Sequence, residues 1–383
     1  MSRKLSWYYI SILVIFLMLP GSLFLLVRGH VDTENYENRK LTELPVYGIT
    51  PYDEWTTVFE GWFTDHLPFK NQLVKLGSMV EYYVFRTSVN DAVLLGRDEW
   101  LYYIGNVNVE EDPRSDYLGL NLFNDEQLKL IAKNLTEAEK ELNDRGCEFI
   151  LFLAPNKERI YPEHMPSYYG GPAAENRLDQ VTRYLRENTD INVFSGNETL
   201  SEFRAVNPDL RLYLRYDTHW NEQGAYVASR PLAEYLGHPI PDIYETHAAR
   251  EDYPVRDLAR LIHLQDILTD DHSYNITQYC DSEFIYRENE DKHFYSEGKD
   301  LDPRKVMLIG DSYRLSMQPF ALNSFKEGYS DYYYNYRKEI LDAEAPDIFI
   351  YECLERFLNN LMEFSLDTGI GYTGNAAADG GIP

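Results

Sequence analysis

The sequence predicts a three-layer α/β domain with a mainly parallel sheet, preceded by a single transmembrane helix. Three observations lead to this prediction. Short apolar runs of strand length alternate with amphipathic helical patterns, as they do in parallel sheets covered by helices. The longest of these runs are apolar throughout, which is typical of strands buried on both faces. An uncharged segment from Leu5 to Val27 precedes all of them and is long enough to cross a bilayer.

The N-terminal apolar segment fits a membrane anchor better than a signal peptide. As a helix it would span about 34 Å, against a bilayer core of about 30 Å. A cleaved signal, the alternative, has an apolar core of only about 7–15 residues and a small-residue cleavage site, which is missing here. Arg3 and Lys4 place the N-terminus in the cytoplasm and the chain after His30 outside. We therefore expect residues 1–30 to form a cytoplasmic tip and membrane anchor, and the remainder to be extracytoplasmic.

The next part of the chain, residues 31–105, is predicted to pack on the main domain. Residues 31–55 are polar with dispersed prolines and form an extended connector. Residues 56–86 carry apolar groups at helical spacing. Residues 92–105, AVLLGRDEWLYYIG, contain two apolar runs around a glycine-containing turn, which predicts a short hairpin.

Residues 106–365 carry the alternating pattern of the α/β domain. Helices and strands are expected in the order helix 124–145, strand 147–155, helix 173–189, strand 191–196, helix 221–237, strand 305–312, helix 315–325 and strand 347–355. The polar, Tyr- and Asp-rich residues 240–300 interrupt this pattern and are expected to form an irregular insertion. Residues 366–383 are rich in glycine and alanine and are expected to be a disordered tail.

Charge and cysteine content exclude several classes of function. The 383 residues include 63 acidic and 36 basic ones, giving a formal net charge of −27. Because phosphate groups repel an acidic surface, nucleic-acid binding is excluded as a main function. Three scattered cysteines suit neither a disulfide framework nor a cysteine-ligated metal, and no histidines show metal-ligand spacing. No metal or cofactor is therefore expected.

The segment KVMLIGDSYRLSM carries the first candidate catalytic residue. An apolar strand ends at Gly310, and Ser312 lies on the turn into the next helix. Ligand sites in open α/β sheets lie at the carboxyl ends of strands. A helix N-terminus also offers free backbone N–H groups that can stabilise an oxyanion. The alternative is that Asp311 or Ser312 is merely a helix N-cap.

The segment RLYLRYDTHWNEQGAY carries the base that a serine nucleophile needs. His219 could accept the Ser312 proton, while Asp217 would fix the tautomer of His219 and stabilise the imidazolium. Trp220 would shield the pair from water or stack on a sugar. The alternative is an ordinary loop histidine, with Asp217 as a helix N-cap.

The order of these motifs resembles a known family. Asp-x-His-Trp followed by Gly-Asp-Ser is similar to the DHHW proteins and to the SGNH-hydrolase-like polysaccharide O-acetyltransferases of the alginate-acetylation (AlgJ/AlgX) type. Further similar blocks follow the same order: ENRKLTELP, FTDHLPFKNQL, LLGRDEWLYY, LFLAPNKERIYPEHMP, RDLARLI and PDIFIYECLERF. The resemblance runs from about residue 35 to about residue 360. It implies an SGNH-like (flavodoxin-like) domain whose triad order is circularly rearranged relative to ordinary SGNH hydrolases.

The resemblance also implies roles and partners. Ser312 would be the nucleophile, His219 the base and Asp217 its orienter. The acceptor would be a polysaccharide, and a multi-pass membrane acyltransferase would supply acetyl groups across the membrane. Asp311 stands where the alginate enzymes tend to have a small hydroxyl residue, and the net charge suits an anionic polymer such as alginate poorly. We therefore expect a neutral or amino-sugar-containing glycan.

Three further residues are candidates for oxyanion stabilisation or substrate binding, beside the backbone N–H of Ser312. The backbone N–H of Tyr313 is the physical default for a second oxyanion donor. Asn156 follows a buried strand and could add a side-chain amide, or it could simply cap a turn. Arg356 could hold an acyl or sugar oxygen, or form a surface pair with Glu352.

Three functions fit this sequence. The first is extracytoplasmic O-acetyl transfer to a surface or secreted polysaccharide through an acyl-serine. The second is a carbohydrate esterase that uses the same triad with water as acceptor, since water exclusion decides between transfer and hydrolysis. The third is a non-catalytic scaffold of an exopolysaccharide assembly with a vestigial triad.

Overall fold

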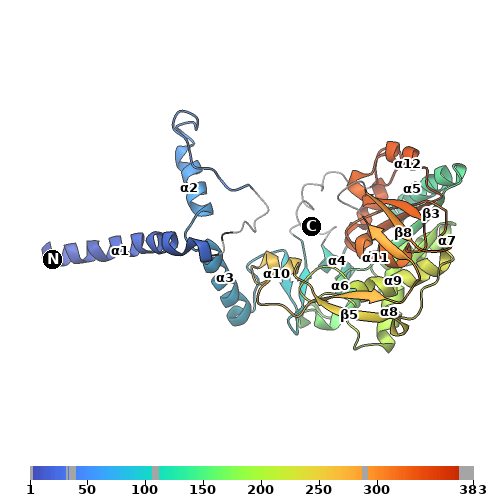
Figure 1. Ribbon diagram of the computed structural model, residues 1–383, viewed down its shortest axis with the longest axis horizontal. Helices are drawn as coiled ribbons and strands as arrows, with labels where there is room; N and C mark the ends of the chain where they lie inside the picture. The colour runs from blue at the N-terminus through green and yellow to red at the C-terminus, as the bar shows by residue number, and fades with distance from the viewer. Residues whose placement is uncertain (1–2, 32, 34–39, 106–111, 287–291, 371–383) are drawn as a thin grey trace. The chain divides into compact units, whose positions relative to one another are not determined.

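The chain forms two compact units. The computed structural model describes residues 3–31, 33, 40–105, 112–286 and 292–370 (Figure 1). The first unit comprises Met1–Asn90 with Ala259–Ile267, and the second Asp91–Leu258 with Leu268–Pro383. The predicted hairpin is present as β1 (Val93–Leu95) and β2 (Leu101–Tyr103). It belongs to the second unit, whereas the sequence analysis grouped it with residues 31–105.

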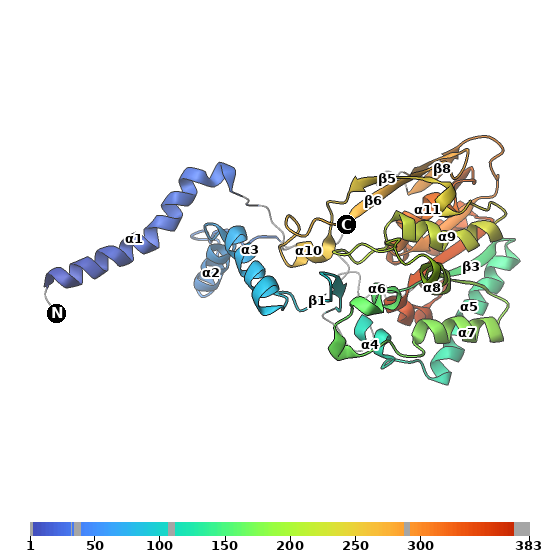
Figure 2. The ribbon, with the colours of Figure 1, turned by 90° about the horizontal axis from the view of Figure 1, so that it is seen from below.

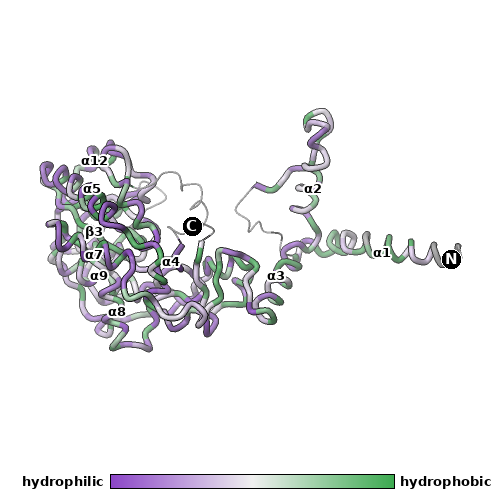
Figure 3. The backbone as a smooth tube through the Cα atoms, turned by 180° about the vertical axis from the view of Figure 1, so that it is seen from behind, coloured by the Kyte–Doolittle hydropathy of each residue, from purple (hydrophilic) through white to green (hydrophobic). Residues whose placement is uncertain are grey.

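The first unit contains the apolar N-terminal helix α1 (Arg3–Val27). Apolar residues run along this helix (Figure 3), and a window within Trp7–His30 has a mean hydropathy of 2.7. By length and composition, this is the one helix in the described residues that could cross a membrane. A signal sequence would meet the same criterion, so the uncleaved anchor stays a prediction.

The helical pattern of residues 56–86 is interrupted in the structure. It forms α2 (Trp55–Asp65) and α3 (Lys70–Val80), and α3 continues into one π-helical turn. Pro68 lies between the two helices and, having no N–H to donate, cannot continue the first one. Phe69 then adopts a left-handed conformation, with φ of 60°, as the second helix begins.

A seven-stranded sheet forms the centre of the second unit. Its strand order is β4-β3-β11-β9-β10-β8-β7. The strands are β3 (Glu148–Ala154), β4 (Asn192–Ser195), β7 (Glu283–Tyr286), β8 (His293–Glu297), β9 (Val306–Gly310), β10 (Glu327–Tyr332) and β11 (Ile348–Leu354). The five strands from β4 to β10 are parallel, and β8 and β7 are antiparallel. The predicted mainly parallel α/β class is confirmed.

Nine α-helices of the described residues lie wholly or partly in this unit. They are α4 (Pro113–Leu118), α5 (Asp125–Asp144), α6 (Lys157–Ile160), α7 (Arg177–Asn188), α8 (Gly196–Val206), α9 (Glu222–Tyr235), α10 (Asp257–Leu261), α11 (Tyr313–Ala321) and α12 (Lys338–Glu344). The predicted start of α5 is confirmed by a capping box around Asn124. Helix α8, which follows β4 directly, was not expected from the sequence.

The sheet has an apolar core on each face, which makes the domain three-layered. Side chains alternate between the faces along each strand. On one face, α8, α9 and α11 cover Ile150, Phe152, Leu308 and Ile350. On the other face, α5, α7 and α12 cover Phe149, Leu151, Met307, Ile309 and Phe349. Figure 2 shows α9 and α11 on one side of β3, and α5 and α7 on the other.

The prediction of an irregular insertion at residues 240–300 is wrong in part. A two-stranded sheet of β5 (His247–Asp252) and β6 (His272–Thr277) lies there, and so do β7 and β8 of the main sheet. Strand β10 was also missed. Strands β5 to β8 are only partly buried, and β10, although buried over residues 328–331, contains the polar Ser330 and Asp331. None of them therefore shows the continuous apolar run that marked the central strands.

The start of the predicted disordered tail is ordered. Leu366 and Ile370 are buried in the same core as α5 and α7, and Ser365 pairs with Gly369. Two apolar side chains therefore fix this segment against the domain. Residues 371–383, the remainder of the predicted tail, lie outside the described residues.

Candidate active site

Ser312 lies at the carboxyl end of a central strand. β9 ends at Gly310 and α11 begins at Tyr313, so Ser312 is on the turn between them, and its side chain is partly exposed. We call residues 310–312 the nucleophile turn. A Cβ on Gly310 would lie 2.5 Å from Oε2 and 2.9 Å from the backbone oxygen of Glu352. Glycine is therefore needed for β9 to approach the end of β11 this closely.

Asp311 ties the nucleophile turn to the neighbouring strand. Its Oδ1 accepts from the Tyr313 N–H at 2.9 Å, and its Oδ2 accepts from the Leu354 N–H at 3.0 Å. The Asp311 N–H donates to Oε2 of the buried Glu352 at 2.9 Å. Asp311 therefore takes the capping bond of α11, and the Ser312 side chain makes none. The alternative of Ser312 as a mere N-cap does not fit this geometry.

His219 and Asp217 lie on a loop at the same edge of the sheet. Residues 214–219, which we call the base loop, are closed by an antiparallel bridge between Tyr213 and Trp220. His219 Nε2 lies 2.7 Å from Ser312 Oγ, and His219 Nδ1 lies 2.7 Å from Asp217 Oδ1. Segments 93 positions apart thus bring a hydroxyl, an imidazole and a carboxylate into one hydrogen-bonded chain.

The electrostatics of the pair favour the charged form of each partner. Burial alone would raise the pKa of Asp217, but the hydrogen bond and charge of His219 outweigh it and leave that pKa below its ordinary value. Burial alone would lower the pKa of His219, but Asp217 and then Asp257 outweigh it and leave that pKa raised. A histidine of raised pKa with an ionised partner is well suited to hold a proton during the reaction.

Asp257 is a third acidic group at the base loop, and the sequence analysis did not single it out. Its carboxylate accepts from the N–H of Thr218 at 2.8 Å and from its Oγ1 at 2.6 Å. Its own N–H donates to Asp217 Oδ2 at 2.9 Å. Burial, and then the charge of Asp217, raises its pKa to about 7. The block RDLARLI, which contains Asp257, is part of the family resemblance and could have pointed to this residue, but the sequence analysis gave it no role.

Asp217, His219 and Asp257 are also the one group in the described residues that could hold a metal ion. Their candidate ligand atoms lie within 4.8 Å of one another. His219 Nδ1 and Asp217 Oδ1 are, however, already hydrogen-bonded to each other, and the Asp257 carboxylate is bonded to Thr218. Metal binding would therefore compete with the orientation of His219.

Two of the four other candidates, Trp220 and Tyr313, are buried next to His219. Trp220 is 1% exposed and packs on Tyr313, with ring centroids 4.9 Å apart. Of the two roles considered for Trp220, this burial fits shielding and does not fit stacking on a sugar. Tyr313 donates its hydroxyl to the Thr218 carbonyl at 2.5 Å and its N–H to Asp311. That N–H would have to leave Asp311 to reach an oxyanion.

The other two candidates follow the ends of β3 and β11. Asn156 directly precedes α6, but its side chain does not cap the helix; its amide donates to Asp116 Oδ2 at 3.3 Å. Arg356 lies over the ring of Tyr103, and its charge lowers the pKa of His219. Glu352 is fully buried and bonded to the nucleophile turn, so it is not half of a surface pair with Arg356.

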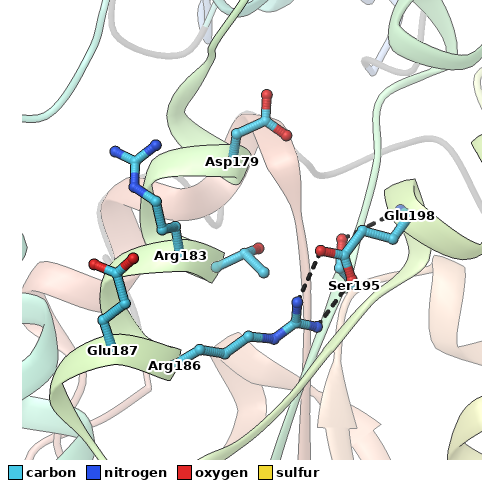
Figure 4. Close-up of a pocket in the computed structure, with 7 residues that line it drawn as sticks. Asp179, Arg183, Arg186, Glu187, Ser195 and Glu198 are labelled. Carbon is cyan, nitrogen blue, oxygen red and sulfur yellow. Dashed lines mark hydrogen bonds and ion pairs between the residues drawn. The ribbon is translucent and has the colours of Figure 1, made fainter.

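A polar pocket lies away from these residues, between α7, β4 and α8 (Figure 4). Its volume is about 400 Å³. Its lining residues are Asp179, Thr182, Arg183, Arg186, Glu187, Ser195 and Glu198. Both of its arginines are paired with glutamates, Arg186 with Glu198 and Arg183 with Glu175. None of the residues predicted to be functional lines it.

Comparisons with known proteins agree with this fold. A family model described as the SGNH hydrolase-like domain of acetyltransferase AlgX matches residues 93–325. A probable alginate O-acetylase AlgJ from Pseudomonas syringae pv. tomato is 24% identical over 241 residues, covering 63% of this chain and 55% of that protein. The chain thus spans about half the length of the curated relatives that it matches.

Two solved structures align with much of this chain. A DHHW family protein from Eubacterium siraeum superposes with a TM-score of 0.50 at 14% identity, covering 71% of this chain and 94% of that one. The O-acetyltransferase domain of Pseudomonas putida AlgJ gives a TM-score of 0.45 at 20% identity, covering 72% and 93%.

Proposed function

Because the chain belongs to the family of SGNH hydrolase-like domains of the acetyltransferase AlgX, we propose that it transfers acetyl groups to polysaccharide hydroxyls through an acyl-serine. The observation that carries the proposal is the chain of two 2.7 Å contacts from Ser312 through His219 to Asp217. This is the arrangement that activates a serine hydroxyl as a nucleophile.

In the first half-reaction, Ser312 attacks the donor. Its Oγ–H proton passes to His219 Nε2 as Oγ forms a bond with the acetyl carbonyl carbon. Asp217, which is held ionised, stabilises the imidazolium from the other ring nitrogen. Collapse of the tetrahedral intermediate breaks the bond to the donor oxygen, which takes the proton from His219. Acetyl-Ser312 remains.

In the second half-reaction, a glycan hydroxyl takes the place of the donor. It gives its proton to His219 Nε2 and attacks the acetyl carbonyl, and Ser312 leaves with that proton. The Ser312 N–H, at the start of α11, is our first candidate for the oxyanion donor in both halves, with the Asn156 amide and Tyr313 N–H as further candidates. Arg356, whose charge acts on His219, is our candidate for holding a substrate oxygen.

The acceptor that we propose is a neutral or amino-sugar-containing glycan outside the cytoplasm. The net charge of −27 repels a polyanion, and the N-terminal helix would hold the domain at the membrane, as an anchor. A multi-pass membrane acyltransferase is the proposed acetyl donor.

The test is an acetyl-transfer assay on the detergent-solubilised full chain. An activated acetyl ester serves as donor, neutral and anionic glycans as acceptors, and mass spectrometry follows both acetylated glycan and free acetate. We expect Ser312→Ala to abolish acetyl-glycan formation and Ser167→Ala, an exposed matched control, to leave it unchanged. Free acetate as the sole product would instead assign an esterase. Unchanged transfer by Ser312→Ala would overturn the proposal.

A further inference from the structure

The base loop holds its shape through side chains that come from elsewhere in the chain. Residues 214–218 lie outside the named strands, yet most of this segment is buried. Buried backbone groups need hydrogen-bond partners, and here ionisable side chains supply several of them.

Lys157 supplies the donors for the carbonyl groups. It begins α6, directly after Asn156, and is 3% exposed. Its ammonium lies 3.1 Å from the Leu214 oxygen, 3.2 Å from the Arg215 oxygen and 2.6 Å from the Asp217 oxygen. An ammonium has three N–H donors. All three therefore donate to carbonyl groups of one loop, and one of these carbonyls belongs to Asp217.

Two aspartates supply the acceptors. Asp271 accepts from the Arg215 N–H at 2.5 Å and the Tyr216 N–H at 2.7 Å. Asp257 accepts from the N–H and hydroxyl of Thr218. Lys157 thus lies among three carboxylates, those of these two residues and of Asp217. Replacing its charge would remove a buried cation that interacts electrostatically with all three.

The surroundings of Lys157 keep its ammonium group away from solvent and from the substrate. Its ammonium lies 5.6 Å from the centroid of the Trp100 ring and 5.2 Å from that of Tyr102. Burial lowers its pKa to about 8, against the opposing charges of Asp271, Asp257 and Asp217, so it stays mainly protonated at pH 7. With each N–H directed at a carbonyl, the ammonium has no donor left for a substrate.

We propose that Lys157 is a positioning residue for the triad: it fixes the base loop so that His219 lies between Asp217 and Ser312. This inference rests on the proposed function and adds to it a residue that does not touch the substrate. A loop displaced by about 1 Å can cost about 100-fold in rate, because the reacting groups no longer meet.

The main test compares Lys157→Met with Lys129→Met, which changes an exposed lysine on α5. We expect Lys157→Met to lower kcat by about 100-fold while KM changes little, because substrate contacts remain and the base is misplaced. Lys129→Met should retain both values. Leu185→Ala, a core truncation in α7, controls for lost stability and should retain kcat below its melting transition. Wild-type kcat in Lys157→Met would overturn the proposal.

A second readout does not depend on turnover. The hydrogen-bonded Nδ1–H proton of His219 should give a far-downfield NMR signal in protein with labelled histidine, since Asp217 accepts it. We expect Lys157→Met to shift or broaden this signal and Lys129→Met to preserve it. If wild-type protein lacks Ser312-dependent turnover, the proposed function fails, but this signal still tests Lys157. An unchanged signal in Lys157→Met would overturn the positioning role.

A milder variant covers the case in which Lys157→Met does not fold. Lys157→Gln offers two N–H donors in place of three and no charge. We expect it to lower kcat less than Lys157→Met and again to leave KM nearly unchanged. A higher KM with an unchanged kcat would contradict the proposal.

Discussion

The two halves of the candidate triad are held in different ways. The nucleophile turn follows β9, which is paired with β11 on one side and β10 on the other. Backbone ladders therefore set the position of Ser312. The base loop has the Tyr213–Trp220 bridge at its root and few other backbone hydrogen bonds, one of them from the Leu101 N–H to the Arg215 oxygen. Side chains, among them those of Lys157, Asp257 and Asp271, bond most of its other backbone groups.

This difference shows what each half requires of the sequence. Backbone hydrogen bonds between strands form with almost any side chain, so the nucleophile turn needs few specific residues. These are Gly310, which allows the close approach to β11, and Asp311, which bonds the Leu354 N–H. A loop outside the sheet needs particular charged side chains from distant segments. Apart from Ser312 itself, we expect changes at the turn to act mainly on folding and changes around the loop to act mainly on catalysis.

The largest expected effect comes from removing both halves together. Ser312→Ala and His219→Ala should each lower kcat by more than about 10,000-fold, and the double variant should lose little more, because triad members act as a unit. Steady-state kinetics with an activated acetyl ester measures this. His247→Ala, at an exposed histidine, is the control and should retain wild-type kcat. Multiplicative losses in the double variant would show that the two residues act independently.

The next effect isolates the base loop. Asp217→Asn keeps the size of the side chain but loses the charge that stabilises the imidazolium, and its amide can favour the wrong tautomer of His219. We expect kcat to fall by about 1,000- to 10,000-fold, with circular dichroism unchanged. Asp209→Asn, at an exposed position, provides the matched control. A loss below about tenfold would remove Asp217 from the triad.

The third prediction concerns the nucleophile turn. Gly310→Ala places a Cβ against the backbone of Glu352, and we expect the free energy of unfolding to drop by about 1–3 kcal/mol. Urea denaturation measures it. Gly171→Ala, where a Cβ would meet nothing within 4 Å, should change stability little. Equal stabilities for the two variants would show that β9 and β11 do not need this close approach.

The smallest effect is a shift of the pH profile. His219 must be neutral to act as base, and its pKa is raised, so kcat/KM should rise with pH through a value above about 6.5. Asp217 and Asp257 raise that pKa, and Arg356 lowers it. Asp257→Asn removes one negative charge and should move the acid limb to lower pH. Because the Asp257 pKa is about 7, this carboxyl group is only partly charged at the pH where His219 titrates. We therefore expect the acid limb to shift by less than about one pH unit.

The matched control for this shift is Asp252→Asn, at an exposed carboxylate on β5. Its acid limb should coincide with that of the wild-type enzyme. A shift of the Asp257→Asn profile to higher pH would contradict the sign of the Asp257 charge effect.

The sequence by itself determined the central strands and the residue types of the candidate triad. Fully apolar runs predicted β3 and β11, and Ser312 was placed at a strand end by its neighbours alone. These features are local, because hydrophobic periodicity, burial on both faces and turn residues can all be recognised within about ten consecutive residues. The same local criterion missed β7 and β8, which are partly exposed, and β10, in which the buried Ser330 and Asp331 interrupt the apolar run.

Only the tertiary structure decided what surrounds the base loop. Lys157 lies 60 positions before Asp217, and Asp257 lies 39 positions after Thr218. In the sequence each is one more charged residue in a chain that is 26% charged. Burial gives them their role, because a charge removed from water must find partners, and which partners it finds depends on how distant segments pack.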